Sequence, residues 1–325
     1  MTLVALAGTA LAAVASLFAQ QGLAQALPAN PIRIVVAQTP GGQSDLLARL
    51  VGEHLGKLVK QRVVIENRPG AGGTIGAEMV SQSQADGSTL LFAGSSNLVL
   101  AAAIGEPLRY DPTTDFAPLG RVAHVPLALA VNSKVAATTL TELITSAKAR
   151  PGALTYGSVG KGAMTRLAVE VLKASAGVDI LEVPYSGTAP ALTDLLAGRI
   201  DMMFFDLALL APHVKAGSLR VIAVAGHRRA ASAPDVPTVA EQGIAGFSIE
   251  PWYGIVAPAK TPPDVLERLK NVIAEMRLQP EFEQRLQELG YEPINDTSQQ
   301  FTAAIAADIR AYSAIIKAAG IQRTP

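Results

Sequence analysis

Residues 32–45 read IRIVVAQTPGGQSD and join a strand, a glycine turn and the start of a helix. The first six residues are β-branched or apolar apart from one arginine, which is typical of a short strand. After the turn, apolar side chains recur at helical spacing, at Leu46, Leu47, Leu50, Val51, Leu55 and Leu58. Gly41 and Gly42 therefore lie at a helix N-terminus, where backbone N–H groups and the helix dipole favour an anion. The alternative is that these glycines only permit a tight turn.

The same alternation of strand and helix patterns continues along the chain and predicts an α/β fold. The further strands that we expect are 62–66, 89–93, 122–131, 154–157, 180–184, 200–205 and 247–257. The further helices are 74–84, 140–149, 163–174, 189–197, 207–214, 262–276, 280–289 and 298–319. The extended segments 122–131, which carries Pro126, and 247–257 are expected to cross between two lobes.

The length of the chain predicts two domains of ordinary size. We expect the first lobe to contain residues 27–125 and 248–300, and the second lobe to contain 126–247. The C-terminal helix, residues 301–325, is assigned to neither lobe. Two lobes imply a cleft between them.

Residues 1–26 are expected to be a signal peptide that directs the protein to the periplasm. No charged side chain occurs before Arg33, and the apolar segment ends in the small-residue triplet Ala24-Gln25-Ala26. The basic residues that usually begin such a peptide are missing. A membrane anchor is the alternative, but glutamines interrupt the apolar run and no basic stop follows it. The chain has no cysteine, which excludes an anchor attached through a lipid-modified cysteine.

Composition and motifs favour a binding protein for small molecules over an enzyme. The 27 basic and 27 acidic residues cancel, and no basic stripe suggests a nucleic acid or an anionic membrane as partner. No Gly-x-Ser-x-Gly elbow follows a strand, and the four histidines lack the spacing of a zinc site. The loop GAGGTIG at 70–76 has Ile75 where a dinucleotide loop needs its third glycine. We therefore expect no catalytic residue, no metal and no cofactor.

A second glycine turn, GSVGKG at residues 157–162, follows the expected strand 154–157 and precedes a helix. Ligands of open parallel sheets lie beyond the carboxyl ends of the strands. One such turn from each lobe can then hold a ligand with anionic groups at both ends. A tight turn without a ligand is again the alternative.

Longer motifs are spread over nearly the whole mature chain. They are PIR at 31–33, PGGQSD at 40–45, AR at 48–49, ENRPGAGG at 66–73, IGA at 75–77, DG at 86–87, YDP at 110–112, VPYSGTAPAL at 183–192, PDVPT at 234–238 and AAGI at 318–321. Together they resemble the periplasmic substrate-binding proteins of tripartite tricarboxylate transporters, the Bug receptors. The resemblance implies a type II periplasmic-binding-protein fold, or Venus flytrap, with two doubly wound α/β domains and two crossover strands.

The resemblance also implies that a monomeric receptor captures a small carboxylate and delivers it to two membrane transporter subunits. In relatives, the first turn and a Ser-x-Gly-x-Gly turn bind the acid through backbone groups and bridging waters. Ser158, Gly160 and Gly162 match the second turn. Two positions depart from the family: Gln38-Thr39 replaces an aromatic residue, and Arg166 replaces a histidine. Arg166 is expected either to pair with a ligand carboxylate, or to lie on the solvated face or pack across the domain edge.

The candidate ligand-binding residues are Thr39, Pro40, Gly41, Gly42, Gln43, Ser95, Ser96, Ser158, Gly160, Lys161, Gly162, Arg166, Tyr185 and Asp206. Asp206 suits a ligand ammonium or hydroxyl, or equally an N-cap of the helix 207–214. Ser95 and Ser96 are expected to donate hydroxyls to the ligand, or to cap a helix. Asp45 is expected to hold the first turn in shape by accepting backbone N–H bonds.

Ligand contact with both turns is expected to stabilise a closed form of the two lobes. A receptor that feeds a transporter is the favoured function. The alternatives are a ligand sensor for a membrane signalling protein and a secreted isomerase or lyase of small acids.

Overall fold

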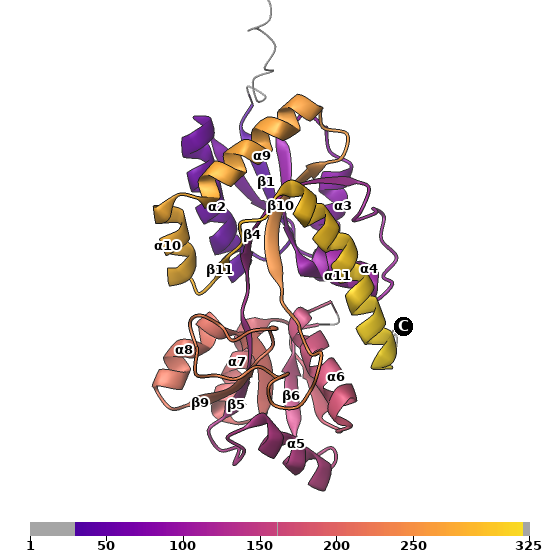
Figure 1. Cartoon of the computed structure of the whole chain (residues 1–325), viewed down its shortest axis with the longest axis vertical. Coiled ribbons are helices and arrows are strands. Elements are labelled where there is room, and N and C mark those ends of the chain that lie inside the picture. Colours follow the sequence, from indigo (N-terminus) through magenta and orange to yellow (C-terminus); the bar gives the residue numbers. More distant parts are fainter. Residues whose placement is uncertain (1–29, 161, 321–325) are drawn as a thin grey trace, which may run out of the picture.

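The fold contains two β-sheets with helices around each, stacked one above the other in Figure 1. The computed structural model describes residues 30–160 and 162–320. The expected signal peptide and the candidate residue Lys161 lie outside the described residues. The six-stranded sheet with its helices is the first lobe, and the five-stranded sheet with its helices is the second lobe.

The first lobe combines parallel and antiparallel strands. In spatial order these are β11 (Glu292–Pro293), β4 (Phe116–His124), β10 (Trp252–Pro258), β3 (Thr89–Gly94), β1 (Ile32–Val36) and β2 (Val63–Asn67). β1 is parallel to β2 and β3, whereas β10 is antiparallel to β3 and β4. The helical segments of this lobe are α2 (Gln43–Val59), η1 (Ala71–Gly73), α3 (Thr74–Ser81), η2 (Ser96–Leu100), α4 (Ala101–Ala103), α9 (Pro263–Arg277), α10 (Pro280–Glu288) and α11 (Ser298–Ala318).

The sheet of the second lobe is covered on both faces. Its strands, in spatial order, are β7 (Leu181–Pro184), β6 (Thr155–Ser158), β8 (Met202–Asp206), β5 (Leu127–Asn132) and β9 (Leu219–Val224). Its helices are α5 (Leu140–Ala149), α6 (Met164–Ala176), α7 (Thr188–Ala197) and α8 (Leu207–Lys215). Successive side chains of β5 belong to different apolar clusters, Leu129 to one and Ala130 to the other. Helices on both faces bury such a strand completely.

The last helix, α11, packs on the first lobe and crosses it diagonally in Figure 1. Its Phe301 ring meets the buried ring of Trp252 edge to face, with 4.9 Å between centroids. Gly254 permits this approach, because an added Cβ atom would lie 2.7 Å from Phe301. The helix begins with a capping box in which Thr297 and Gln300 exchange side-chain and backbone bonds.

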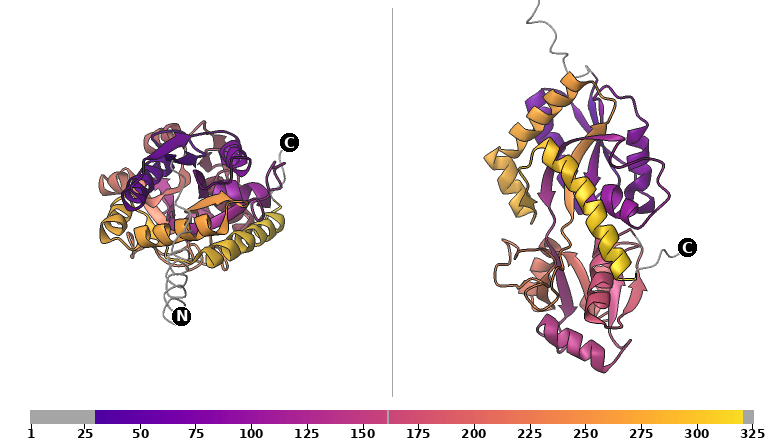
Figure 2. Two further views of the ribbon diagram at one scale, coloured as in Figure 1. Left: turned by 90° about the horizontal axis from the view of Figure 1, so that it is seen from above. Right: turned by 45° about the vertical axis from the view of Figure 1, so that its right-hand side comes forward.

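Two segments join the lobes, and Figure 2 shows both between the upper and lower sheets. The expected strand 122–131 is wrong as one strand: β4 ends at His124 in the first sheet, and β5 begins at Leu127 in the second. Pro126 lies between them and has no N–H to continue a ladder. The return segment follows β9 and becomes regular only at Trp252, five residues later than expected. The proposed residue boundaries of the two lobes stay a prediction.

Candidate ligand-binding site

The first glycine turn leads directly into α2, as the sequence predicts. Thr39, Pro40 and Gly41 are exposed, and Gly42 and Gln43 are half-buried. Gly41 has φ +79°, and a Cβ atom there would meet nothing within 4 Å. Gly42 is the N-cap residue, and no side chain caps the helix. The first N–H groups of α2 are therefore left without the partner that a capping side chain supplies.

The side chain of Asp45, in the first turn of α2, fixes the shape of this glycine turn through hydrogen bonds. Its carboxylate accepts a 3.0 Å bond from the Gly41 backbone N–H and a 2.9 Å bond from Asn67. Arg49, one helical turn further on, adds bonds of 2.9 and 3.0 Å to the two carboxylate oxygens. Burial alone would raise the pKa of Asp45, but the bonds from Arg49, Gly41 and Asn67 hold that pKa below its ordinary value. Asp45 is therefore a charged support of the turn.

The second glycine turn connects β6 to α6. Gly160 has φ +113° and open space around an added Cβ atom. Ala163 is the N-cap residue of α6, and no side chain caps this helix. Ser158 is fully buried, and its hydroxyl donates a 2.5 Å bond to Glu182. Like the first turn, this turn presents a helix N-terminus without a capping side chain.

Arg166 forms a two-bond pair with a carboxylate of the protein itself. Its Nε and Nη2 atoms lie 2.8 and 3.2 Å from the two carboxylate oxygens of Glu182 on β7. The side chain is 18% exposed, and its role toward a ligand stays a prediction. Burial raises the pKa of Glu182, but bonds from Arg166 and Ser158 bring it below its ordinary value. The geometry expected for a ligand carboxylate is thus made with Glu182.

The two lobes touch where their glycine loops lie. A Cβ atom on Gly162, in the second turn, would lie 3.5 Å from the Cα atom of Gly72 in η1. Gly73, the neighbour of Gly72, packs against Ala37, which is the residue directly after β1. Ala37 leads directly into the first turn. Both glycine turns therefore belong to the same boundary between the lobes.

Asp206 ends β8 at this boundary and is the N-cap residue of α8. Its side chain makes no cap bond, although an N-cap role was the alternative considered from the sequence. Burial raises the pKa of Asp206 to about 6. Two tyrosines neighbour it, Tyr253 of β10 and Tyr291. These tyrosines are absent from the candidate list, although Tyr253 follows the chain's single tryptophan in an extended segment.

The family model described as "Tripartite tricarboxylate transporter family receptor" matches residues 47–321. The chain belongs to this receptor family. The receptor is 33% identical to Protein BugT of Bordetella pertussis over 298 residues, which cover 91% of each chain. It is 37% identical to a UPF0065 protein of Bordetella bronchiseptica over 287 residues, 88% of this chain and 84% of the other.

Solved structures of similar proteins match about nine-tenths of this chain. An R. palustris protein with adipate matches the receptor with a TM-score of 0.83 at 33% identity, covering 90% of this chain and 98% of the other. MatC of Rhodopseudomonas palustris with bound malate gives 0.80 at 28% identity, covering 89% and 99%. Periplasmic binding protein BugD gives 0.81 at 30% identity, covering 91% and 100%. The resemblance to Bug receptors and the two-lobed fold predicted from it are confirmed.

Three further candidate side chains of the receptor, Ser95, Ser96 and Tyr185, differ in burial and in their hydrogen-bond partners. The buried hydroxyl of Ser95 accepts a 2.8 Å bond from the backbone N–H of Trp252, so this serine ties β3 to β10. Its contacts give no support to the ligand role expected for it. Ser96 is half-buried at the start of η2. The Tyr185 hydroxyl donates to Asp194 over 2.9 Å, and burial first, then this bond, raise its pKa to about 12.

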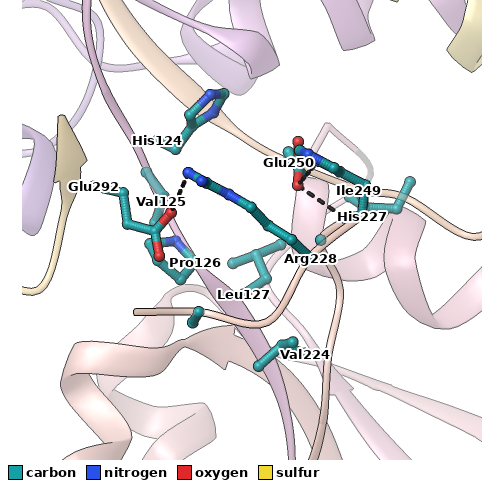
Figure 3. A pocket seen from close by; sticks show the side chains of 12 residues that line it. His124, Val125, Pro126, Leu127, Val224, His227, Arg228, Ile249, Glu250 and Glu292 are labelled. Atoms are coloured by element: carbon teal, nitrogen blue, oxygen red, sulfur yellow. Dashed lines mark hydrogen bonds and ion pairs between the residues drawn. The ribbon is translucent and has the colours of Figure 1, made fainter. Parts of the chain in front are cut away.

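A pocket of the receptor lies between the two crossing segments (Figure 3), lined by none of the candidate ligand residues. His124 faces into it, and Arg228 reaches across it to Glu292 with 3.2 Å between the charged groups. On the other side, His227 lies 2.6 Å from Glu250. The first pair ties the return segment to β11, and the second lies within the return segment. The two crossing segments are joined by a 2.8 Å bond from the backbone N–H of Val125 to the carbonyl of Pro251, so the pocket lies where the lobes are connected.

The described part of the receptor offers no metal centre. Within residues 30–160 and 162–320, no group of three or more histidine, aspartate or glutamate side chains is placed to hold an ion. Over the same residues, every helix is too short or too polar to cross a membrane.

Proposed function

We propose that this receptor is exported to the periplasm and holds a small carboxylate between its lobes, at the turns 38–42 and 158–163. The observation that carries the proposal is the pair of helix N-termini, α2 behind Gly42 and α6 behind Ala163, without capping side chains. Both belong to the boundary where Gly72 meets Gly162. Adipate and malate in two similar structures give the chemical class.

The chemistry follows from the backbone. Helix N-termini carry partial positive charge and N–H groups that point along the axis, so a carboxylate is stabilised there without a cationic side chain. Gly41 and Gly160 add no side chain of their own at these turns, and a Cβ atom at either position would meet no atom of the described residues within 4 Å. A ligand that touches one turn in each lobe favours the closed form, because its contacts are complete only there.

Delivery is the second part of the proposal. The closed receptor, a monomer, presents its joined lobes to two membrane subunits of a tripartite transporter, which the family name supports. Uptake of a bound acid into vesicles that carry those subunits should require the receptor, and a receptor-independent rate would contradict delivery.

Calorimetry of the mature protein with adipate, malate, succinate, aspartate and aromatic acids tests the binding step. We expect one site per chain, and at a hundred times the dissociation constant a ligand should stabilise the fold by about 2.7 kcal/mol. Failure of every acid to bind would overturn the proposal.

Two glycines at opposite ends of α6 provide a matched pair of variants. Gly160 and Gly177 both have positive φ and open space for a Cβ atom, but only Gly160 belongs to the proposed site. Each change to alanine should cost about 1 kcal/mol of stability, because alanine is strained there. Gly160→Ala should also weaken acid binding at least tenfold, whereas Gly177→Ala should bind as the parent does. Equal affinity of both variants would remove the second turn from the site.

A further inference from the structure

Asp206 is a carboxylate without a hydrogen-bond donor in the part of the chain that the structure describes. It ends β8, and its side chain does not cap α8. Neither a hydrogen bond nor an ion pair reaches its carboxyl group from residues 30–160 or 162–320. Asp206 is half-buried, so its carboxylate is partly removed from water and has no protein donor in return. Partly desolvated groups without a partner persist mainly where function needs them.

The two tyrosines beside Asp206 already have other acceptors. Tyr291 donates its hydroxyl to Oε1 of Gln43 over 3.2 Å. The hydroxyl of Tyr253 lies 3.5 Å from Oε1 of Gln38. A phenol has one proton, so a tyrosine that donates to a glutamine has none left for Asp206.

Asp206 also lies beside both glycine turns. β8 is parallel to β6, so Asp206 and the turn after Ser158 are at the carboxyl ends of neighbouring strands. Gln38 belongs to the first turn and Gln43 begins α2, and their contacts with the two tyrosines link that turn to Asp206. A small acid held at the turns would therefore bring its remaining groups near this carboxylate.

We infer that Asp206 accepts a hydrogen bond from an ammonium or hydroxyl group of the ligand, and that the receptor selects amino or hydroxy acids over plain carboxylates. The inference rests on the proposed function, the binding of a carboxylate at the two turns. Asp206 supplies the acceptor that a backbone site built of N–H donors lacks. A site built to pair with a donor rejects the analogue without it, because a buried polar group is then left unpaired.

Calorimetry with acids of equal length tests the inference. The four-carbon set is succinate, malate and aspartate, and the six-carbon set is adipate and 2-aminoadipate. In each set that binds, the donor-bearing acid should bind at least tenfold more tightly than the plain acid, which corresponds to about 1.4 kcal/mol. Comparing malate with aspartate tells a hydroxyl from an ammonium as the preferred donor.

Asp206→Ala should reduce that ratio to about one, whereas Asp179→Ala, which removes an exposed carboxylate from the same lobe, should preserve it. Should Asp206→Ala fail to fold, Asp206→Asn keeps the shape and removes the charge, and a lower preference for aspartate is expected. The inference would be overturned if the parent bound plain and donor-bearing acids equally, or if Asp206→Ala kept the parent's ratio of the two affinities. Either result would leave the proposed function standing. Failure of every acid to bind would overturn both.

Discussion

A Cβ atom on Gly290 would lie 2.2 Å from the Cβ atom of Ala208. Gly290 precedes β11 in the first lobe, and Ala208 lies in the first turn of α8 in the second lobe. The backbone of one lobe therefore rests on a methyl group of the other. With the contact between Gly72 and Gly162, the lobes meet at two separate points, as closure of the two lobes requires.

Ala208→Leu should block this closure, because three more carbon atoms have no room against Gly290. We expect the affinity for a bound acid to fall at least tenfold, since the ligand gains its full contacts only when the lobes meet. Calorimetry gives the affinity. Small-angle scattering should show ligand-induced compaction in the parent and none in the variant.

Ala211→Leu is the control for the change at position 208, because Ala211 is exposed on the same helix. It should bind and compact as the parent does. Parental affinity in Ala208→Leu would show that the lobes do not need this contact to hold the ligand.

Asp45→Ala should loosen the first turn and weaken acid binding. The change leaves the Gly41 N–H, Asn67 and Arg49 without their shared acceptor, which we expect to cost about 2–4 kcal/mol of unfolding free energy. Denaturant unfolding measures the stability, and calorimetry at a temperature where the variant is folded measures binding.

Glu53→Ala on the exposed side of the same helix is the matched control, since the one ion pair of Glu53 within residues 30–160 and 162–320 is with exposed Lys57 at i,i+4. Stability and binding should stay near those of the parent. If Asp45→Ala folds and binds the acid with the affinity of the parent, Asp45 is not needed to shape the binding site.

Local patterns predicted most of the fold because each helix carries its own apolar stripe. The expected helix 140–149 agrees with α5, and Thr139 caps it through its side chain. The stretch around Pro126 was misassigned because both of its halves are apolar, and periodicity does not say to which sheet a strand belongs. β9 is absent from the expected strands although its residues, LRVIAV, form a short apolar run.

The partners of the site residues could not be predicted from the sequence. Arg166 and Glu182 are sixteen residues apart and meet only because α6 packs on β6, the strand next to the edge strand β7. Ser95 meets Trp252 across two strands that pair in the sheet. Asp45 was accessible to sequence reasoning because its partner Gly41 lies within the same turn. Local bonds follow from spacing, whereas long-range pairs follow from topology.

Glu182→Gln should destabilise the second lobe at neutral pH by about 1–2 kcal/mol, because the pair with half-buried Arg166 lies between exposed and buried ion pairs in strength. The pKa of Glu182 is below its ordinary value of 4.5 in the folded protein. The pair therefore stabilises the fold fully above pH 4.5, and this stabilisation disappears as the pH falls through the lowered folded pKa. Urea unfolding should show the difference at pH 7 and a smaller one near pH 3.

Glu267→Gln is the control, because Glu267 is 68% exposed and only approaches Lys270 at 4.0 Å. Its stability should follow that of the parent at every pH. A difference for Glu182→Gln that does not change between pH 7 and pH 3 would assign the effect to packing instead of charge.

Asp206→Asn should have the opposite effect on the ligand-free protein. Burial raises the pKa of Asp206 from 3.8 to about 6, so the folded state holds this proton more tightly than the unfolded chain does. The parent therefore loses stability as the pH rises from about 4 to about 6, by up to about 3 kcal/mol for a shift of this size. Asparagine stays neutral, so the variant should equal the parent near pH 4 and exceed its stability at pH 7.

Urea unfolding at the two pH values measures this gain, with Asp179→Asn as the exposed control. Saturation with a donor-bearing acid should reduce the gain at pH 7, because the ligand pairs with Asp206 in the parent and has no carboxylate to meet in the variant. A variant that is less stable than the parent at pH 7 would mean that Asp206 already has a stabilising partner. It would then be a structural residue.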